Sequence, residues 1–79
     1  MSIEVAVPSL GEAMTSVEIG RWHKQPGDAV ALDDTLVELI TDKADIMLPS
    51  PVAGTLVEQR VATGTRVDVG VIVAVIAAR

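Results

Sequence analysis

Apolar and polar residues alternate in short runs along the whole chain, and turn-forming residues separate the runs. Alternation with a period of two is typical of β-strands that bury one face. No stretch of ten or more residues keeps apolar side chains at i, i+3 and i+4 between breakers, so we expect no substantial helix. The runs predict eight strands, at residues 3–7, 17–23, 29–30, 36–41, 44–48, 54–59, 66–67 and 71–76.

The second half of the chain repeats the pattern of the first half. Val-Ala-Val-Pro-Ser at residues 5–9 matches Ile-Met-Leu-Pro-Ser at residues 46–50 with an offset of 41, and residues 27–32 match residues 64–69 with an offset of 37. Such self-similarity indicates the architecture before any motif is considered. Chance resemblance between Val-rich strands is the alternative, but the two matches come in the same order in both halves. The change of 4 in the offset indicates a four-residue insertion within Leu10 to Ser16.

Eight short strands related by a pseudo-twofold axis predict an all-β fold. We expect a flattened β-barrel or sandwich of two four-stranded sheets, also called a barrel-sandwich hybrid. Val and Ile together outnumber Leu roughly three to one, which suits a pleated surface. A chain of 79 residues has room for one domain, 1–79, with one modest core.

Composition and charge argue against several classes of partner. The net charge is −5 and one Trp is the only aromatic residue, so we expect no binding to nucleic acid or to anionic lipid. No apolar stretch approaches the ~20 residues needed to span a bilayer. Met1 stands just before the first strand, without a leader pattern, which favours a bacterial cytoplasmic protein.

Few residues suggest catalysis or metal binding. His23 is the only histidine, and the sequence pairs no serine with an evident base, so we do not predict an enzyme. Asp28, Asp33 and Asp34 lack the spacing of a calcium loop and are expected to be solvated turn carboxylates. We expect Trp22 to be a core or half-buried packing residue.

Residues 36–48 join the two halves as two apolar strands with almost nothing between them. A two-residue hairpin turn with Asp42 and Lys43 at its tip is the natural solution, although it lacks the Gly that primed turns favour. Such a tip would hold one long amine in solvent on a rigid base. Position alone leaves open that Lys43 is an ordinary solvated lysine.

Four segments resemble the lipoyl domain of the dihydrolipoyl acyltransferase component of 2-oxo acid dehydrogenase complexes. They are Val-Pro-Ser-Leu-Gly-Glu at residues 7–12, Trp-His-Lys-Gln-Pro-Gly-Asp at 22–28, Thr-Asp-Lys-Ala at 41–44 and Pro-Ser-Pro-Val-Ala-Gly at 49–54. They occur in the family's order over most of the chain. The fold that this resemblance implies is the two-halved sandwich that the repeat indicates independently.

The resemblance implies that lipoic acid is joined by an amide to Lys43, with Asp42 and Ala44 as the flanking turn residues. Biotinyl carrier domains share the fold but usually flank their lysine with methionines, which argues for the lipoyl assignment. An unmodified β-sandwich interaction module is the remaining alternative. The domain itself would be a non-catalytic carrier, monomeric in isolation, and the N-terminal part of a longer acyltransferase.

The resemblance also implies a set of partners. A thiamine diphosphate-dependent 2-oxo acid dehydrogenase would acylate the arm, the acyltransferase core would pass the acyl group to coenzyme A, and a dihydrolipoyl dehydrogenase would reoxidise the dithiol. A lipoate ligase or a lipoyl or octanoyl transferase would attach the group. The 2-oxo acid stays open, because residues 22–28 resemble 2-oxoglutarate or actinobacterial-type acyltransferases whereas residues 40–44 and 49–54 resemble branched-chain ones.

The hairpin departs from the family in one respect. Many relatives carry acidic residues on the strands that flank the Asp-Lys pair, where strand alternation here puts Ile40 and Met47 on the outer face as diagonal neighbours. We hypothesise that these two side chains contact the partner enzyme, although scattered exposed apolar residues are normal on any surface. The insertion matches a family loop that helps to select the partner, so it is a second recognition candidate: Leu10, Gly11, Glu12, Ala13, Met14 and Thr15.

Overall fold

The computed structural model describes residues 1–9, 15–41 and 45–78. It contains eight strands, β1 (Ser2–Ala6), β2 (Ser16–Trp22), β3 (Ala29–Val30), β4 (Thr35–Ile40), β5 (Asp45–Pro49), β6 (Gly54–Gln59), β7 (Arg66–Asp68) and β8 (Ile72–Ala78). The eight predicted strands are therefore confirmed, with ends shifted by at most two residues. In these parts of the chain no helix has the length and apolarity to cross a membrane.

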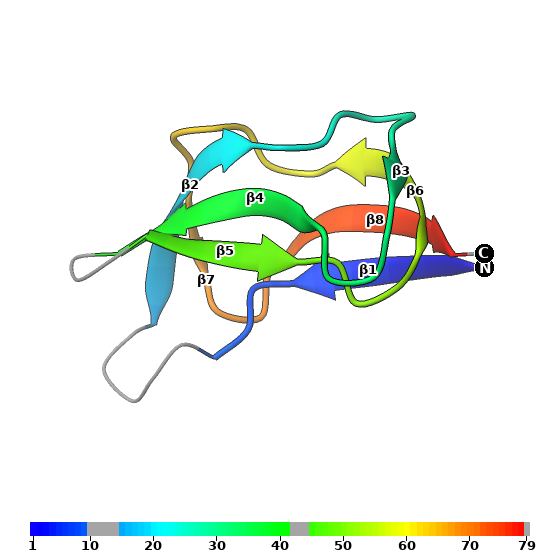
Figure 1. The fold of residues 1–79 in the computed structure, drawn as a ribbon. Coiled ribbons are helices and arrows are strands. Elements are labelled where there is room, and N and C mark those ends of the chain that lie inside the picture. Colours follow the sequence, from blue (N-terminus) through cyan, green and yellow to red (C-terminus); the bar gives the residue numbers. More distant parts are fainter. Residues whose placement is uncertain (10–14, 42–44, 79) are drawn as a thin grey trace.

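The strands form two antiparallel sheets that face each other, as Figure 1 shows. One sheet has the order β1-β8-β6-β3 and the other has the order β5-β4-β2-β7. The sequence repeat relates β1 to β5, β2 to β6, β3 to β7 and β4 to β8. Exchanging each strand for its counterpart converts one sheet order into the other, which confirms the predicted pseudo-twofold relation.

The core consists of Val, Leu, Ile and Ala side chains from the inner faces of both sheets. Its largest fully buried members are Ile19, Leu36, Leu39, Leu56 and Ile76. Trp22, Val52 and Val69 pack against it from its margin. The Trp22 indole Nε1 donates a hydrogen bond to the Val61 carbonyl at 3.1 Å, so Trp22 is the half-buried packing residue that the sequence predicted.

One position breaks the simple alternation of faces. Leu36 and its neighbour Val37 are both completely buried. The pairing of β4 with β5 shifts between Thr35 and Val37, because a bulge at this point inserts an extra residue. Beyond the bulge the alternation resumes, so that Leu39 is buried while Glu38 and Ile40 are only partly covered.

Four tight turns repeat in the two halves and share one backbone feature. Their third residues have positive φ values: 97° at Gly27, 72° at Asp33, 92° at Gly64 and 93° at Gly70. Gly64 lies 37 residues after Gly27, and Gly70 lies 37 residues after Asp33, which is the offset of the sequence repeat. The turns at Gly27 and Gly64 thus follow the sequence repeat that relates the two halves.

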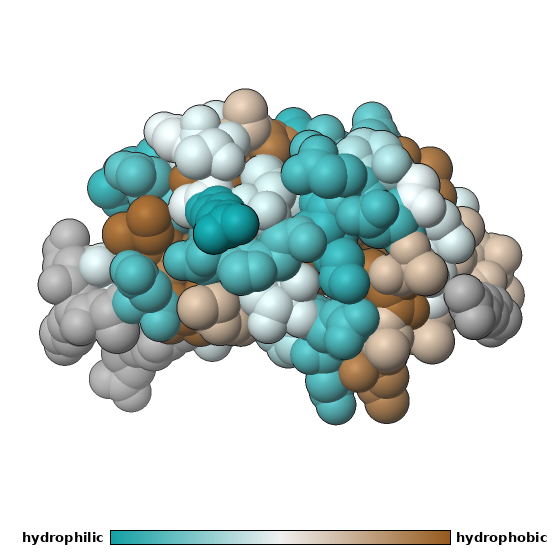
Figure 2. Space-filling model, turned by 45° about the horizontal axis from the view of Figure 1, so that its top comes forward, coloured by the Kyte–Doolittle hydropathy of each residue, from teal (hydrophilic) through white to brown (hydrophobic). Residues whose placement is uncertain are grey.

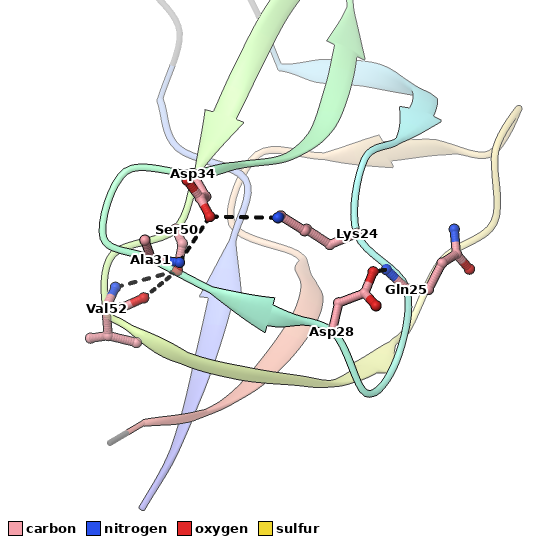
Figure 3. A network of polar contacts seen from close by, with 7 residues as sticks. All are labelled: Lys24, Gln25, Asp28, Ala31, Asp34, Ser50 and Val52. Atoms are coloured by element: carbon pink, nitrogen blue, oxygen red, sulfur yellow. Dashed lines mark hydrogen bonds and ion pairs between the residues drawn. The ribbon is translucent and has the colours of Figure 1, made fainter.

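In the first half, aspartate side chains close two of these turns, as Figure 3 shows. The Asp28 carboxylate accepts the Gln25 amide at 2.8 Å, and the Asp34 carboxylate accepts the Ala31 amide at 2.9 Å. Lys24 Nζ lies 3.5 Å from the same Asp34 oxygen. The hydrogen bond from Ala31 lowers the pKa of the Asp34 carboxyl; desolvation opposes this shift and Lys24 adds to it.

The domain is elongated, with extents of 35 × 21 × 17 Å. The amide of Ala78 donates to the carbonyl of Met1 at 2.8 Å, so the chain begins and ends side by side. The end of β4 and the start of β5 lie at the opposite end of the long axis (Figure 1).

Candidate functional site

The predicted attachment site is the connection between β4 and β5. Its residues Asp42, Lys43 and Ala44 lie outside the described residues, whereas the strands on both sides of them are described. The strands pair Glu38 with Met47, Leu39 with Ile46 and Ile40 with Asp45. This is the register that the sequence predicted for the hairpin.

The outer face of this sheet carries one continuous cross-strand row near the hairpin. Asp45 pairs with Ile40, Ile40 pairs with Glu18, and Glu18 pairs with Arg66, so the row crosses all four strands. Directly opposite residues of an antiparallel pair point to the same face. The neighbouring pairs on β2, β4 and β7, which include Ile19 with Leu39, are buried, so the row faces outward.

Ile40 and Met47, the two predicted recognition residues, differ in their exposure. Met47 is 49% exposed. Ile40 is only partly exposed, because its side chain lies over Gly20 of β2: an ideal Cβ on Gly20 would stand 3.0 Å from Ile40 Cδ1. The strand register confirms that Ile40 and Met47 are diagonal neighbours. The Ile40 side chain can pack over β2 because Gly20 has no side chain there.

An open groove of 670 Å³ adjoins this row on the same face. The segment after β6 forms its far wall, where the Thr63 hydroxyl donates to the Gly20 carbonyl at 2.8 Å. Residues that line the groove include Glu18, Gly20, Trp22, Glu38, Ile40 and Thr63. The groove therefore begins beside Ile40 and runs away from the hairpin along β2.

The single histidine is part of the same face. His23 Nε2 lies 2.7 Å from Glu38 Oε2, which ties the end of β2 to β4. Two of the serines have other partners: Ser16 Oγ accepts from Arg66 at 3.2 Å, and buried Ser50 donates to the Val52 carbonyl. Neither serine is therefore placed as a nucleophile for His23, and the described part of the chain brings together no group of three or more metal-ligating residues.

The second recognition candidate is the insertion between β1 and β2. Residues 10–14 lie outside the described residues, and only Thr15 of the predicted set is described. Thr15 is exposed, and its carbonyl accepts the Val69 amide at 3.0 Å. The insertion thus enters β2 at Ser16, two residues before Glu18 in the row next to the hairpin.

The sequence did not single out Glu18, which the structure places directly beside Ile40. The signal was available, since Glu18 is the polar residue between two buried ones, Val17 and Ile19. The sequence did not show that Glu18 lies beside Ile40. Strand alternation predicts which face a side chain is on, but it does not predict which strand lies next to which in the sheet. Ile40 is apolar, but both of its direct cross-strand neighbours, Asp45 and Glu18, are acidic.

Comparison with known proteins gives consistent findings. A family model described as biotin-requiring enzyme, the biotin/lipoyl family, matches residues 3–76. The chain is 45% identical over 78 residues to the dihydrolipoyllysine-residue succinyltransferase component of the 2-oxoglutarate dehydrogenase complex of Bartonella vinsonii, covering 99% of this chain and 19% of that protein. It is 43% identical over 76 residues to the dihydrolipoyllysine-residue acetyltransferase component of the pyruvate dehydrogenase complex of Corynebacterium glutamicum, covering 96% of this chain and 11% of that protein.

A solved structure has the same fold. The lipoyl domain of the 2-oxoglutarate dehydrogenase complex of Azotobacter vinelandii is similar with a TM-score of 0.77 and 27% identity, over 95% of each chain. The chain therefore matches nearly the whole length of that domain, whereas it spans a fifth or less of the two curated relatives.

Proposed function

This chain belongs to the biotin/lipoyl family, and from that premise we propose that it is a lipoyl carrier domain in which lipoic acid is attached by an amide bond to Lys43. The observation that carries the proposal is the similarity over nearly the whole chain to dihydrolipoyllysine acyltransferase components, joined to a lysine between two paired strands. Asp42 and Ala44 flank that lysine in sequence.

The described strands are a suitable base for such an arm. Four consecutive residue pairs, from Val37–Leu48 to Ile40–Asp45, join β4 to β5, and Leu39 and Leu48 anchor the strands in the core. A rigid base fixes where the arm begins. Tethering then raises the effective concentration of the dithiolane at each active site within its reach.

In this role the domain performs none of the chemical steps itself. The arm accepts an acyl group from a thiamine diphosphate-dependent 2-oxo acid dehydrogenase and delivers it to an acyltransferase core for transfer to coenzyme A. A dihydrolipoyl dehydrogenase then reoxidises the dithiol, and a lipoate ligase or lipoyl transferase attaches the group at the outset. The parent chain is a dihydrolipoyl acyltransferase.

Biotin attachment is the competing function, because the matching family model covers both kinds of domain. The named relatives above are dihydrolipoyllysine proteins, and Lys43 has Asp and Ala as neighbours where biotinyl domains usually have methionines. Both observations favour lipoate.

Intact-mass spectrometry tests the proposal directly. The chain is incubated with lipoate, ATP and a lipoate ligase, and in parallel with biotin, ATP and a biotin ligase. We expect one lipoyl adduct, mapped by peptide sequencing to Lys43, and no biotinyl adduct. An unmodified chain in both reactions, or biotin alone on Lys43, would overturn the lipoyl assignment.

The 2-oxo acid is decided by a second measurement. The lipoylated domain is offered in turn to 2-oxoglutarate, pyruvate and branched-chain 2-oxo acid dehydrogenases, and kcat/KM for reductive acylation is compared. The named relatives belong to 2-oxoglutarate and pyruvate complexes, and a third, from Pseudomonas aeruginosa, to a branched-chain complex. We expect one of the three enzymes to be preferred, and no acylation by any of them would count against the carrier role.

A further inference from the structure

The groove along β2 opens beside the strand ends that lead to the proposed attachment lysine. Its mouth lies at Ile40, which pairs with Asp45 directly before the connection between β4 and β5. From there the lining follows β2 from Gly20 to Trp22. Two residue steps along a strand cover about 7 Å. The whole floor is therefore close to the point where the arm begins.

The only aromatic side chain of the protein lines this groove. Trp22 is half-buried, and its indole Nε1 already donates to the Val61 carbonyl at 3.1 Å. The polar group of the ring is thus satisfied within the protein, so the indole offers the groove apolar and π surface. Alkyl groups pack well on such surface, and divalent sulfur makes favourable contacts with aromatic rings.

Polar side chains of the lining are also engaged within the protein. Three of them have partners there: Thr63 with the Gly20 carbonyl at 2.8 Å, Gln59 with the Lys24 carbonyl at 2.8 Å, and Glu38 with His23 at 2.7 Å. A polar guest would have to compete for these groups, whereas an apolar guest leaves their hydrogen bonds intact and gains from burial. The groove therefore favours a guest that is mainly apolar.

The equivalent position in the other half of the molecule carries a side chain. Gly20 corresponds to Val57 through the repeat offset of 37, and Val57 is 51% exposed on β6. Without a side chain at Gly20, Ile40 packs low over β2, with its Cδ1 3.0 Å from the place where a Cβ would stand. The low floor of the groove thus comes from glycine at this position and is not imposed by the repeat.

The distribution of apolar surface favours a narrow guest. On the face that Figure 2 draws, apolar residues lie in separate small patches among polar ones. Patches of this kind are ordinary on the surface of a soluble domain and do not form one broad docking face in that view. A flexible chain that carries a small ring fits a groove better than the surface of a second protein does.

We propose that the groove along β2 is a docking site for the domain's own lipoyl arm, in which the disulfide ring contacts Trp22 and the alkyl chain lies over Ile40. The inference rests on the lipoyl function proposed above and adds a resting position for the attached group. Amide formation removes the charge of the Lys43 amine, so the arm is neutral and largely apolar, as the lining requires.

Tethering makes even weak docking effective. A short flexible linker gives an effective concentration of order mM, so a groove with a dissociation constant of about 1 mM holds its guest about half of the time. The docked ring is shielded from solvent, and the undocked fraction reaches the active sites of the partner enzymes. Docking at this strength therefore costs the carrier only about a factor of two in available arm.

The test reads the fluorescence of Trp22, which is the only Trp in a chain without Tyr or Phe. Intact mass first establishes that the domain carries one lipoyl group on Lys43. A disulfide quenches indole fluorescence on contact, so we expect the lipoylated domain to emit on the order of half as strongly as the unmodified domain. Free lipoamide at the same micromolar concentration should leave the emission of the unmodified domain unchanged.

A blocking variant makes the test specific to the groove. Ala62 is exposed and lines the groove wall, so Ala62→Leu fills part of the groove from outside the core and should remove most of the quenching. The matched control is Ala53→Leu, the same change at an exposed bend between β5 and β6 that does not line the groove. Its lipoylated form should be quenched as strongly as the wild-type domain.

Amide and indole chemical shifts give a second measurement that does not depend on quenching. Lipoylation should shift the signals of Gly20, Thr63 and the Trp22 indole N–H in the wild-type domain and in Ala53→Leu. In Ala62→Leu these shifts should be much smaller. They should also be independent of protein concentration, because the arm and the groove belong to one molecule.

Three results would overturn the proposal. The first is equal emission and equal groove shifts in the lipoylated and unmodified wild-type domains. The second is equal quenching in Ala62→Leu and Ala53→Leu. The third is quenching that grows with protein concentration, which would assign the groove to the arm of a second copy. A domain that acquires no lipoyl group on Lys43 would instead contradict the carrier function itself.

Discussion

Asp33 and Gly70 occupy equivalent turn positions in the two halves, and both have a left-handed backbone, with φ values of 72° and 93°. An L-residue in this region costs about 1–2 kcal/mol relative to right-handed conformations, and Asp tolerates it better than most. The two halves thus form the same turn with different residues, Asp33 in the first half and Gly70 in the second. Substitutions at these two equivalent positions can be compared directly.

We expect Asp33→Gly to raise the free energy of unfolding by roughly 0.5–1 kcal/mol, because relief of the backbone strain exceeds the entropic cost of glycine. Gly70→Ala should lower it by about 1–2 kcal/mol through φ alone, since a Cβ there would meet no neighbour within 4 Å. Urea denaturation measures both changes. A destabilised Asp33→Gly variant would contradict this account of the turn.

Gly20 and Ile40 are expected to be energetically coupled. A methyl group on Gly20 would meet Ile40 Cδ1 at 3.0 Å and the Glu38 carbonyl oxygen at 3.1 Å, so Gly20→Ala should cost about 1–3 kcal/mol of stability. Ile40→Ala makes room and should recover about 1 kcal/mol of that cost in the double variant. The backbone contact at Glu38 would remain.

A double-mutant cycle in urea measures this coupling. Gly20→Ala combined with Met47→Ala is the control, because Met47 is not among the atoms nearest to the Gly20 site. Those two changes should add. Coupling of the same size in both cycles would mean that Gly20→Ala disturbs the whole sheet rather than the seat of Ile40.

Asp34 should make the stability of the domain sensitive to acid. Its pKa is lowered in the folded state, chiefly by the hydrogen bond from the Ala31 amide, so folding favours the ionised carboxylate. The resulting stabilisation is fully present above the ordinary aspartate pKa of about 3.9 and is lost as the pH falls through the folded-state value. Asp34→Asn has no such dependence.

Urea denaturation between pH 7 and pH 2.5 checks this sign. The stability difference between the wild-type domain and Asp34→Asn should be constant above about pH 5 and should shift toward the variant in acid. Lys24→Gln is expected to remove only the smaller part of the effect, because the amide hydrogen bond is its main cause. A stability difference between the wild-type domain and Asp34→Asn that does not change with pH would contradict this role of Asp34.

Lys43→Arg is expected to abolish the modification completely while leaving the fold intact, because arginine keeps the charge but offers no amine that forms the amide. Lys24→Arg should be modified fully, as Lys24 lies in the segment after β2 and interacts with Asp34. Intact mass measures the modification of each variant, and circular dichroism measures whether its fold is intact. If the Lys43→Arg variant is still modified, the attachment site is another lysine.

Much of the fold could be predicted from the sequence, because strand periodicity and the repeat are local or self-similar properties. The register of the hairpin followed from alternation and a short connection, and it placed Met47 opposite Glu38 correctly. The burial of both Leu36 and Val37 did not follow, because a bulge interrupts the period at that point. Asp33 gave no sign of its left-handed turn until its counterpart Gly70 was recognised.

The candidate site shows the same division. The resemblance gave Lys43 and strand alternation gave the face of Ile40, whereas Glu18 required knowledge of which strand lies next to β4. That neighbour is set by the long-range order β5-β4-β2-β7. Strands β2 and β4 are joined through β3 rather than by a hairpin, so no local pattern predicts their pairing.

The hydrogen bond between Ala78 and Met1 has a practical consequence for experiments on this domain. Because the first and last described residues meet at the end of the long axis opposite strands β4 and β5 where these two approach their connection (Figure 1), an affinity tag, a biosensor tether or a fused protein can be attached at either end without crowding those strand ends. A domain immobilised through either terminus can be used in binding measurements, because the end with strands β4 and β5 then faces the solution.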